Sequence, residues 1–260
     1  MKNSPLTRRW IVATFAAWLS LPVATLAQAP PPVPAYDPSK TAILLVDPYN
    51  DFLAEGGKLW PLVKSTADAV GLHEHLKQLL AKAREAGIQI VYVPHHHTAE
   101  GDFDDWKFLA PSHVGAQAFR VFEKGSWGAE YHADYQPQPG DLEARHHWTA
   151  SGFANTDLDF LLKSRGIDHV VLAGLRANTC IESTGRYAVE LGYHVTLVKD
   201  AIAAFGQPEM DATINVNFPA FGHAVVTTES FLGGLGVSKQ GSGQADEGED
   251  PAERPHAQND

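Results

Sequence analysis

Short, uninterrupted apolar runs that alternate with segments of helical periodicity constrain this fold more than any other feature of the chain. The runs cover residues 42–46, 88–93, 170–173, 194–198 and 224–228. Such runs are typical of parallel strands that are buried on both faces. The intervening periodicity predicts helices over 67–86, 158–165, 185–191 and 208–217. This alternation predicts an α/β fold, with a mostly parallel sheet between two layers of helices.

The single cysteine, Cys180, lies where the third predicted strand gives way to a helix. Open α/β sheets place ligands at that end of their strands. The unpaired N–H groups of a helix start also favour a thiolate over a thiol. A small, buried apolar residue is the alternative interpretation of a lone cysteine. The position between strand and helix favours a functional thiol.

Asp47 follows the first predicted strand and is therefore expected at the same edge of the sheet as Cys180. A carboxylate in that position can take the thiol proton and later return a proton to a leaving group. Capping of the following turn is the alternative role. The pair predicts nucleophilic catalysis by the thiol, with Asp47 as acid and base.

Two segments, residues 44–52 (LLVDPYNDF) and 174–184 (GLRANTCIEST), resemble the signature segments of the isochorismatase-like cysteine hydrolases. The resemblance covers about residues 41–230. It implies a Rossmann-like three-layer α/β/α fold and an Asp-Lys-Cys triad, with Asp47 and Cys180 as two of its members. It also implies a cis peptide at Leu175–Arg176. The backbone N–H groups of Arg176 and Cys180 would then form an oxyanion hole.

The third member of the triad departs from this family pattern. The family has a lysine four residues before Ser-Ala-Phe or Ser-Gly-Phe, and here that position holds His147. An imidazolium would lower the thiol pKa much as an ammonium does, whereas a neutral imidazole would act as a base. A packed histidine is the alternative interpretation. Lys124 is a second candidate for the missing charge.

Several residues near the predicted strand ends are candidates for substrate or metal binding. His95, His96 and His97 follow the second strand, where nicotinamidases of the family hold a metal on aspartate and histidines. The matching aspartate is absent, so we expect no required cofactor and retain a divalent metal on His95 and His97 as an alternative. The long segment 99–140 is expected to line a pocket, form a subunit contact or cover a sheet edge. We assign substrate binding to Trp60, His95, Trp127 and Phe153.

The two ends of the chain differ in composition from the central domain, residues 41–237. Residues 1–27 resemble a signal peptide, with Arg8 and Arg9 permitting either Sec or twin-arginine export. A proline-rich linker, 28–40, and an acidic, disordered tail, 238–260, are expected to flank the domain. The predicted location is the periplasm or the exterior, with no stable membrane span after cleavage.

These observations predict an exported cysteine hydrolase that cleaves a C–N bond of a small molecule. The formal charge of −11 argues against a nucleic-acid partner. A single cysteine forms no internal disulfide. We also expect a homo-oligomer. The alternatives are a vinyl-ether hydrolase of the isochorismatase type, or an altered protein that binds a small ligand or metal.

Overall fold

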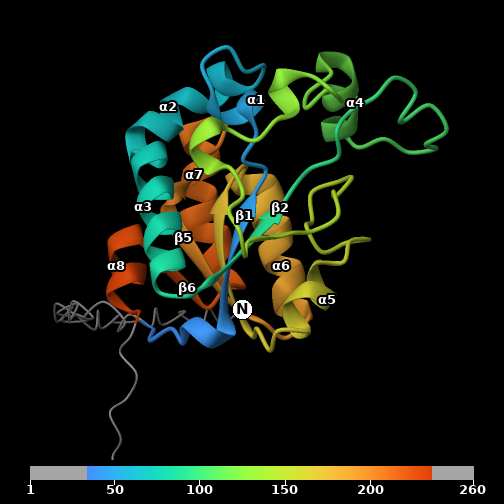
Figure 1. Ribbon diagram of the computed structural model, residues 1–260. Helices are drawn as coiled ribbons and strands as arrows, with labels where there is room; N and C mark the ends of the chain where they lie inside the picture. The colour runs from blue at the N-terminus through green and yellow to red at the C-terminus, as the bar shows by residue number, and fades with distance from the viewer. Residues whose placement is uncertain (1–33, 236–260) are drawn as a thin grey trace, which may run out of the picture. The chain divides into compact units, whose positions relative to one another are not determined.

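The computed structural model describes residues 34–235. The predicted signal peptide, most of the linker and the acidic tail lie outside the described residues. Within them, six strands form one sheet in the order β3-β2-β1-β4-β5-β6, and every pair of neighbours is parallel (Figure 1). The strands are β1 (Thr41–Val46), β2 (Gln89–Val93), β3 (Leu142–Glu143), β4 (His169–Gly174), β5 (His194–Ile202) and β6 (Ala224–Val226).

Helices cover both faces of the sheet, as the alternating sequence predicts (Figure 1). Because successive side chains of a strand point to opposite faces, Ile43 and Leu45 of β1 enter one core, and Ala42 and Leu44 enter the other. The predicted α/β fold is confirmed. The helices are α1 (Asn50–Leu53), α2 (Trp60–Val70), α3 (Leu72–Glu85), α4 (Pro111–Phe119), α5 (Leu158–Lys163), α6 (Glu182–Glu190), α7 (Gln207–Ala212) and α8 (Thr228–Gly233).

Three elements differ from the sequence prediction. The helix expected over 67–86 is two helices, because Gly71 adopts a left-handed conformation (φ 64°) and ends α2. The helix expected over 208–217 ends as a π-helical turn after Ala212. The two-residue strand β3 is too short to produce a recognisable pattern in the sequence.

The described part of the predicted linker, residues 34–40, packs against the domain instead of forming an extended tether. The Tyr36 side chain is buried, and its hydroxyl lies 3.2 Å from Thr196 Oγ1. Its ring packs edge-on against Phe231, and its backbone N–H donates to the Gly234 carbonyl. The Tyr36 ring is therefore part of the core, although the surrounding prolines favour an extended linker.

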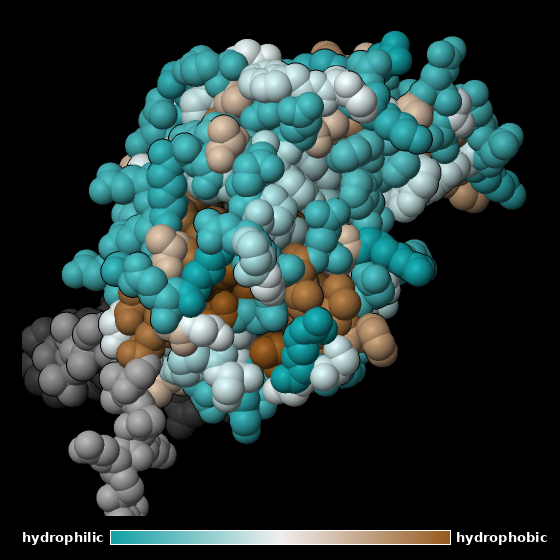
Figure 2. All heavy atoms as spheres, viewed as in Figure 1, coloured by the Kyte–Doolittle hydropathy of each residue, from teal (hydrophilic) through white to brown (hydrophobic). Residues whose placement is uncertain are grey.

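The described helices are too short or too polar to cross a membrane. Figure 2 shows polar residues over most of the face in view, with apolar residues reaching the surface near its centre, over the strands. In Figure 1, β1 and β2 run toward the part of the domain where α1 and α4 lie, and β4 pairs parallel with β1, so its carboxyl end lies at the same edge of the sheet. Loops at that end bring the predicted site residues together.

Candidate active site

Asp47 occupies the sharp turn directly after β1. Its backbone has a positive φ of 50°, and its N–H donates to the Val93 carbonyl at 3.1 Å. The side chain has no exposed surface. The turn therefore redirects the chain while the carboxylate stays fixed at the edge of the sheet, between the ends of β1 and β2.

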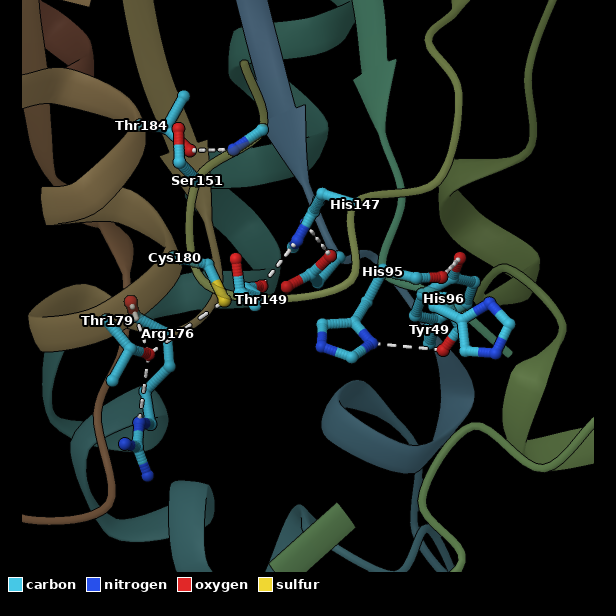
Figure 3. Close-up of polar contacts among 12 residues, drawn as sticks. Tyr49, His95, His96, His147, Thr149, Ser151, Arg176, Thr179, Cys180 and Thr184 are labelled. Carbon is cyan, nitrogen blue, oxygen red and sulfur yellow. Dashed lines mark hydrogen bonds and ion pairs between the residues drawn. The ribbon is translucent and has the colours of Figure 1, made fainter. Parts of the chain in front are cut away.

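His147 reaches Asp47 because its backbone continues the sheet beyond β2. The His147 N–H donates to the Pro94 carbonyl at 2.9 Å, and the His147 carbonyl accepts from the His96 N–H at 2.8 Å. Figure 3 shows the imidazole directed toward the centre of the site. Its Nε2 lies 3.0 Å from Asp47 Oδ1, and its Nδ1 lies 2.8 Å from the Thr149 carbonyl oxygen.

The contacts of His147 fix where its protons lie. A carbonyl oxygen only accepts, so Nδ1 carries the proton that it donates to Thr149. The contact between Nε2 and the Asp47 carboxylate requires a second proton. Burial opposes a charged imidazole, but attraction to Asp47 and the hydrogen bonds to Asp47 and Thr149 outweigh it and raise the pKa of His147. These contacts favour an imidazolium paired with a carboxylate.

Cys180 lies on the π-helical turn η4 (Ala177–Ile181) between β4 and α6. Its sulfur, a carboxylate oxygen of Asp47 and a ring nitrogen of His147 all lie within 4.8 Å of one another. Burial and the Asp47 charge raise the pKa of the thiol well above its usual value, and the Thr179 hydroxyl and the Arg176 N–H oppose them. The thiolate expected from the helix start is therefore not favoured, and the thiol donates to Asp47.

The peptide bond between Leu175 and Arg176 is cis, as the family resemblance implies. The Arg176 backbone N–H points at the Cys180 sulfur, where it lowers the thiol pKa. A donor at this place is suited to an oxygen that becomes negative beside the sulfur.

Cys180 and Asp47 border a cavity of about 390 Å³. Its polar lining includes His95, Thr149, Arg176 and Thr179. Apolar side chains form most of the remaining wall. These are Phe52, Leu59, Leu62, Pro111, Ala116, Phe119, Val121, Phe122 and Phe205.

Comparison with known proteins agrees with this arrangement. The model of the isochorismatase domain matches residues 41–230. The ureidoacrylate amidohydrolase RutB of Caulobacter segnis is 32% identical over 221 residues, which cover 81% of this chain and 92% of that protein. This chain belongs to the isochorismatase family.

Solved structures of the isochorismatase family share the fold. A cysteine hydrolase from Pseudomonas syringae pv. phaseolicola 1448A is 27% identical, with a TM-score of 0.65 over 77% of this chain and 94% of that one. An N-carbamoylsarcosine amidase from Thermoplasma acidophilum is also 27% identical, with a TM-score of 0.56 over 73% and 97% of the two chains. The chain is therefore a hydrolase of this family.

Of the four residues assigned to substrate binding, only His95 lines this cavity. Trp60 is buried against His73, because the chain enters α2 with Leu59 and Leu62 on the cavity side. Trp127 is half-exposed and lies outside the cavity lining. Phe153 is a core residue, stacked on Tyr187 and packed against Tyr193. The structure therefore places these three residues outside the lining of the cavity.

Sequence reasoning missed the cavity wall that α4 supplies. Residues of α4, within segment 99–140, line the cavity, but Trp127, the aromatic residue of this segment that we assigned to substrate binding, does not. Phe119 and Phe122 take that place. The apolar positions of this nine-residue helix are few and do not reveal its orientation. Phe205 has no sequence signal beyond its place after β5.

His95 and His97 do not converge on one metal ion. His95 lines the main cavity, whereas His97 lines a second cavity beside Tyr131 and His146. Within residues 34–235, neither belongs to a group of three close ligand atoms. The nearby carboxylate of Asp102 pairs with His96 Nε2 at 2.7 Å. This arrangement does not fit a metal on His95 and His97.

His95 is suited to contacting substrate as a neutral ring. Burial and the neighbouring His147 lower its pKa to about 4. Its ring lies edge-on to that of His147, with centroids 5.0 Å apart. Lys124, the second candidate for the missing charge, is exposed and lies outside the cavity lining. Only His147 is therefore placed to substitute for the family's lysine.

Proposed function

We propose that this chain hydrolyses a C–N bond of a small amide through a thioester on Cys180. The proximity of a thiol, a carboxylate and an imidazole within 4.8 Å at the base of a cavity carries the proposal. The names of its relatives support amide-type chemistry, because they include a ureidoacrylate amidohydrolase and an N-carbamoylsarcosine amidase.

In the first half-reaction, the Cys180 sulfur attacks the amide carbonyl as Asp47 takes the thiol proton. The raised pKa of the thiol suits this order, since the proton stays on sulfur until a base removes it during attack. The developing oxyanion accepts hydrogen bonds from the backbone N–H groups of Arg176 and Cys180. Asp47 then donates the proton to the leaving nitrogen, and a thioester remains.

In the second half-reaction, Asp47 takes a proton from water as the water attacks the thioester carbonyl. The tetrahedral intermediate collapses, the C–S bond breaks, and the proton returns to the sulfur. One water is consumed, and an acid and an amine-type product are released. Asp47 therefore acts alternately as base and acid, with no net change in the enzyme.

His147 supports this cycle by its charge. When Asp47 accepts the thiol proton, the negative charge moves to the sulfur and then to the substrate oxygen. An imidazolium within the same buried cluster stabilises that charge in place of the family's lysine. Its Nδ1 bond to Thr149 holds the ring in position.

Trapping of the acyl-enzyme tests this function. The domain is mixed with a panel of small amides and quenched in acid, and its mass is measured. We expect an added acyl mass on the peptide that contains Cys180, and none in Cys180→Ala. Since the chain has no second cysteine, the assignment is unambiguous. Turnover by Cys180→Ala at the wild-type rate would refute the proposal.

We also propose export with cleavage near Ala27, on the charged start and apolar stretch of the sequence. The expected mature protein begins at or close to Gln28. Mass spectrometry of protein from the periplasm or medium measures this end directly. Recovery of full-length protein from the cytosol alone would contradict the proposal.

A further inference from the structure

The side chain of Arg176 lies in the cavity wall, next to the catalytic residues but with no role in the mechanism above. Its guanidinium carbon stacks 3.9 Å from the centre of the Phe205 ring, and its Nε donates to Thr179 Oγ1 at 3.3 Å. Figure 3 shows the guanidinium extending away from the Cys180 sulfur. Stacking and the Thr179 contact hold the head group while leaving both terminal nitrogens free to donate.

This guanidinium lacks a carboxylate partner. Within residues 34–235, no acidic group lies within 4.0 Å of it, whereas Arg84 and Arg186 each have one. Burial lowers the pKa of Arg176, and attraction to Cys180 and, from beyond ion-pair distance, to Glu209 offsets this effect only in part. A half-buried arginine without an anion is costly, so a ligand that supplies one is bound more tightly.

The other residues of the cavity lining indicate the chemistry of the rest of the ligand that carries this anion. Among residues 34–235, Arg176 is the only lysine or arginine in its lining, and most of the other lining residues are apolar. The acidic group in the lining, Asp47, is already paired with His147. The cavity therefore matches a ligand with one negative charge at one end, an apolar middle and a reactive carbonyl at the other.

We propose that Arg176 is a carboxylate-binding residue, and that the substrates are short amides that carry a carboxylate remote from the scissile bond. This inference rests on the proposed function and names its substrate class. The planar guanidinium matches a carboxylate with two parallel hydrogen bonds. A dianionic phosphate would place an unmatched second charge near the developing oxyanion, so the arrangement favours a monoanion.

Alkylation of Cys180 tests the inference without a known substrate. The probes are iodoalkanoic acids of increasing length and their primary amides, which differ in charge but little in size. Every labelling event reports one residue, because Cys180 is the only cysteine. The measured quantity is the ratio of acid to amide labelling rates at each length, which cancels changes in thiol reactivity.

Arg176→Met removes the charge while keeping an unbranched side chain, and Arg176→Lys keeps the charge without the planar fork. The matched control is Arg186→Met. Arg186 also stacks on a phenylalanine, Phe221, at 4.3 Å, but lies outside the cavity lining. The control therefore removes the same kind of stacked cation from another place.

For acids long enough to reach the guanidinium, we expect Arg176→Met to lower the acid-to-amide ratio roughly tenfold to a hundredfold. Arg176→Lys should retain part of the preference, and Arg186→Met all of it. An unchanged ratio in Arg176→Met and Arg176→Lys would overturn the inference. Equal slowing of acids and amides would also overturn it, because Arg176 would then act on the thiol.

Failure of the proposed function is distinguishable from failure of this inference. If Cys180 resists every reagent, calorimetry with butyrate and butyramide measures the same preference without covalent chemistry. Butyrate binding that weakens in Arg176→Met but not in Arg186→Met supports the carboxylate site. Equal binding of both compounds to wild type and Arg176→Met refutes it.

Discussion

The cavity has two sides that differ in nearly every physical property. We call the buried cluster Asp47, His147 and Cys180 the floor, of which Asp47 and Cys180 border the cavity, and we call Leu62 and Phe119 the outer wall. The floor is polar, and each of its residues is at most 8% exposed. The outer wall is apolar, with Leu62 49% and Phe119 71% exposed. The floor comes from strand ends and the chain beside them, whereas the outer wall comes from α2 and α4.

This difference indicates that the floor carries out the chemical step and that the outer wall binds the substrate. The buried charges of the floor each depend on a partner at a fixed distance, so a small displacement there is costly. The outer wall makes nonspecific apolar contacts, each worth about 25 cal/mol per Å² of buried surface. Changes on the floor are expected to alter the rate of the chemical step, and changes on the outer wall to alter binding.

The largest expected effect is that of Cys180→Ala on the floor. Covalent catalysis fails without the sulfur, so turnover should fall by several orders of magnitude. Steady-state assays with a hydrolysed amide measure this loss, and thermal unfolding checks that the fold persists. A modest loss would show that the floor does not carry the chemistry.

Replacement of His147 should have the next largest effect. Because the pKa of His147 is raised, its charge is present at low pH and is lost as the pH rises through the raised value. Activity should therefore fall on the alkaline side, and His147→Lys should move that limb to higher pH. His147→Ala should slow turnover and iodoacetamide labelling of Cys180 by roughly tenfold or more.

His146→Lys is the matched control for this charge. His146 lies next along the chain but borders the second cavity. The His146→Lys variant should leave the pH profile unchanged. The free energy of unfolding should follow the same pH dependence, because the raised pKa of His147 in the folded state stabilises the protein at low pH, and this contribution is lost as the pH rises. If His147→Lys leaves the alkaline limb in place, the third catalytic group lies elsewhere.

A smaller effect is expected from the outer wall. Phe119→Ala removes an apolar side chain from the mouth of the cavity and should raise KM several-fold with little change in kcat. Competition kinetics with substrates of different apolar length would show the largest change for the longest. A fall in kcat with unchanged KM would break the division between floor and outer wall.

The smallest effect is expected for Trp127→Ala. The side chain is half-exposed outside the cavity lining, although its carbonyl accepts from the Asn50 side chain. Alanine keeps that carbonyl, so KM and kcat should stay within about twofold of wild type. A large rise in KM would reinstate Trp127 as a substrate-binding residue.

The floor could be predicted from the sequence because its position follows from local rules. Asp47 comes directly after β1 and Cys180 lies on the turn that follows β4, and parallel strands bring such ends together. The role of His147 could be predicted only from the family pattern, because the backbone pairing that places it beside the end of β2 leaves no periodic signal in the sequence. The position of Cys180 at a helix start predicts a thiolate, but burial and the charge of Asp47 keep the thiol protonated, and neither can be inferred from the local sequence.

The outer wall could not be predicted because its contacts connect residues distant in the sequence. Leu62 of α2 and Phe119 of α4 line the same cavity, although they lie far apart in the sequence. Other aromatic residues of segment 99–140, such as Trp127, are indistinguishable from Phe119 in composition but do not line the cavity. Side-chain direction at the start of α2 also decided between Leu59 and Trp60. Such choices depend on tertiary packing, which periodicity does not encode.

The contact between Tyr36 and the final described turn has a practical consequence. Tyr36 pairs with Gly234 and Leu235, so the two ends of residues 34–235 lie side by side at the amino edge of the sheet. The cavity lies at the carboxyl edge. A short peptide joining the two ends would give a cyclic or permuted protein with an undisturbed substrate entrance. Immobilisation on a resin through either end would leave that entrance facing the solution.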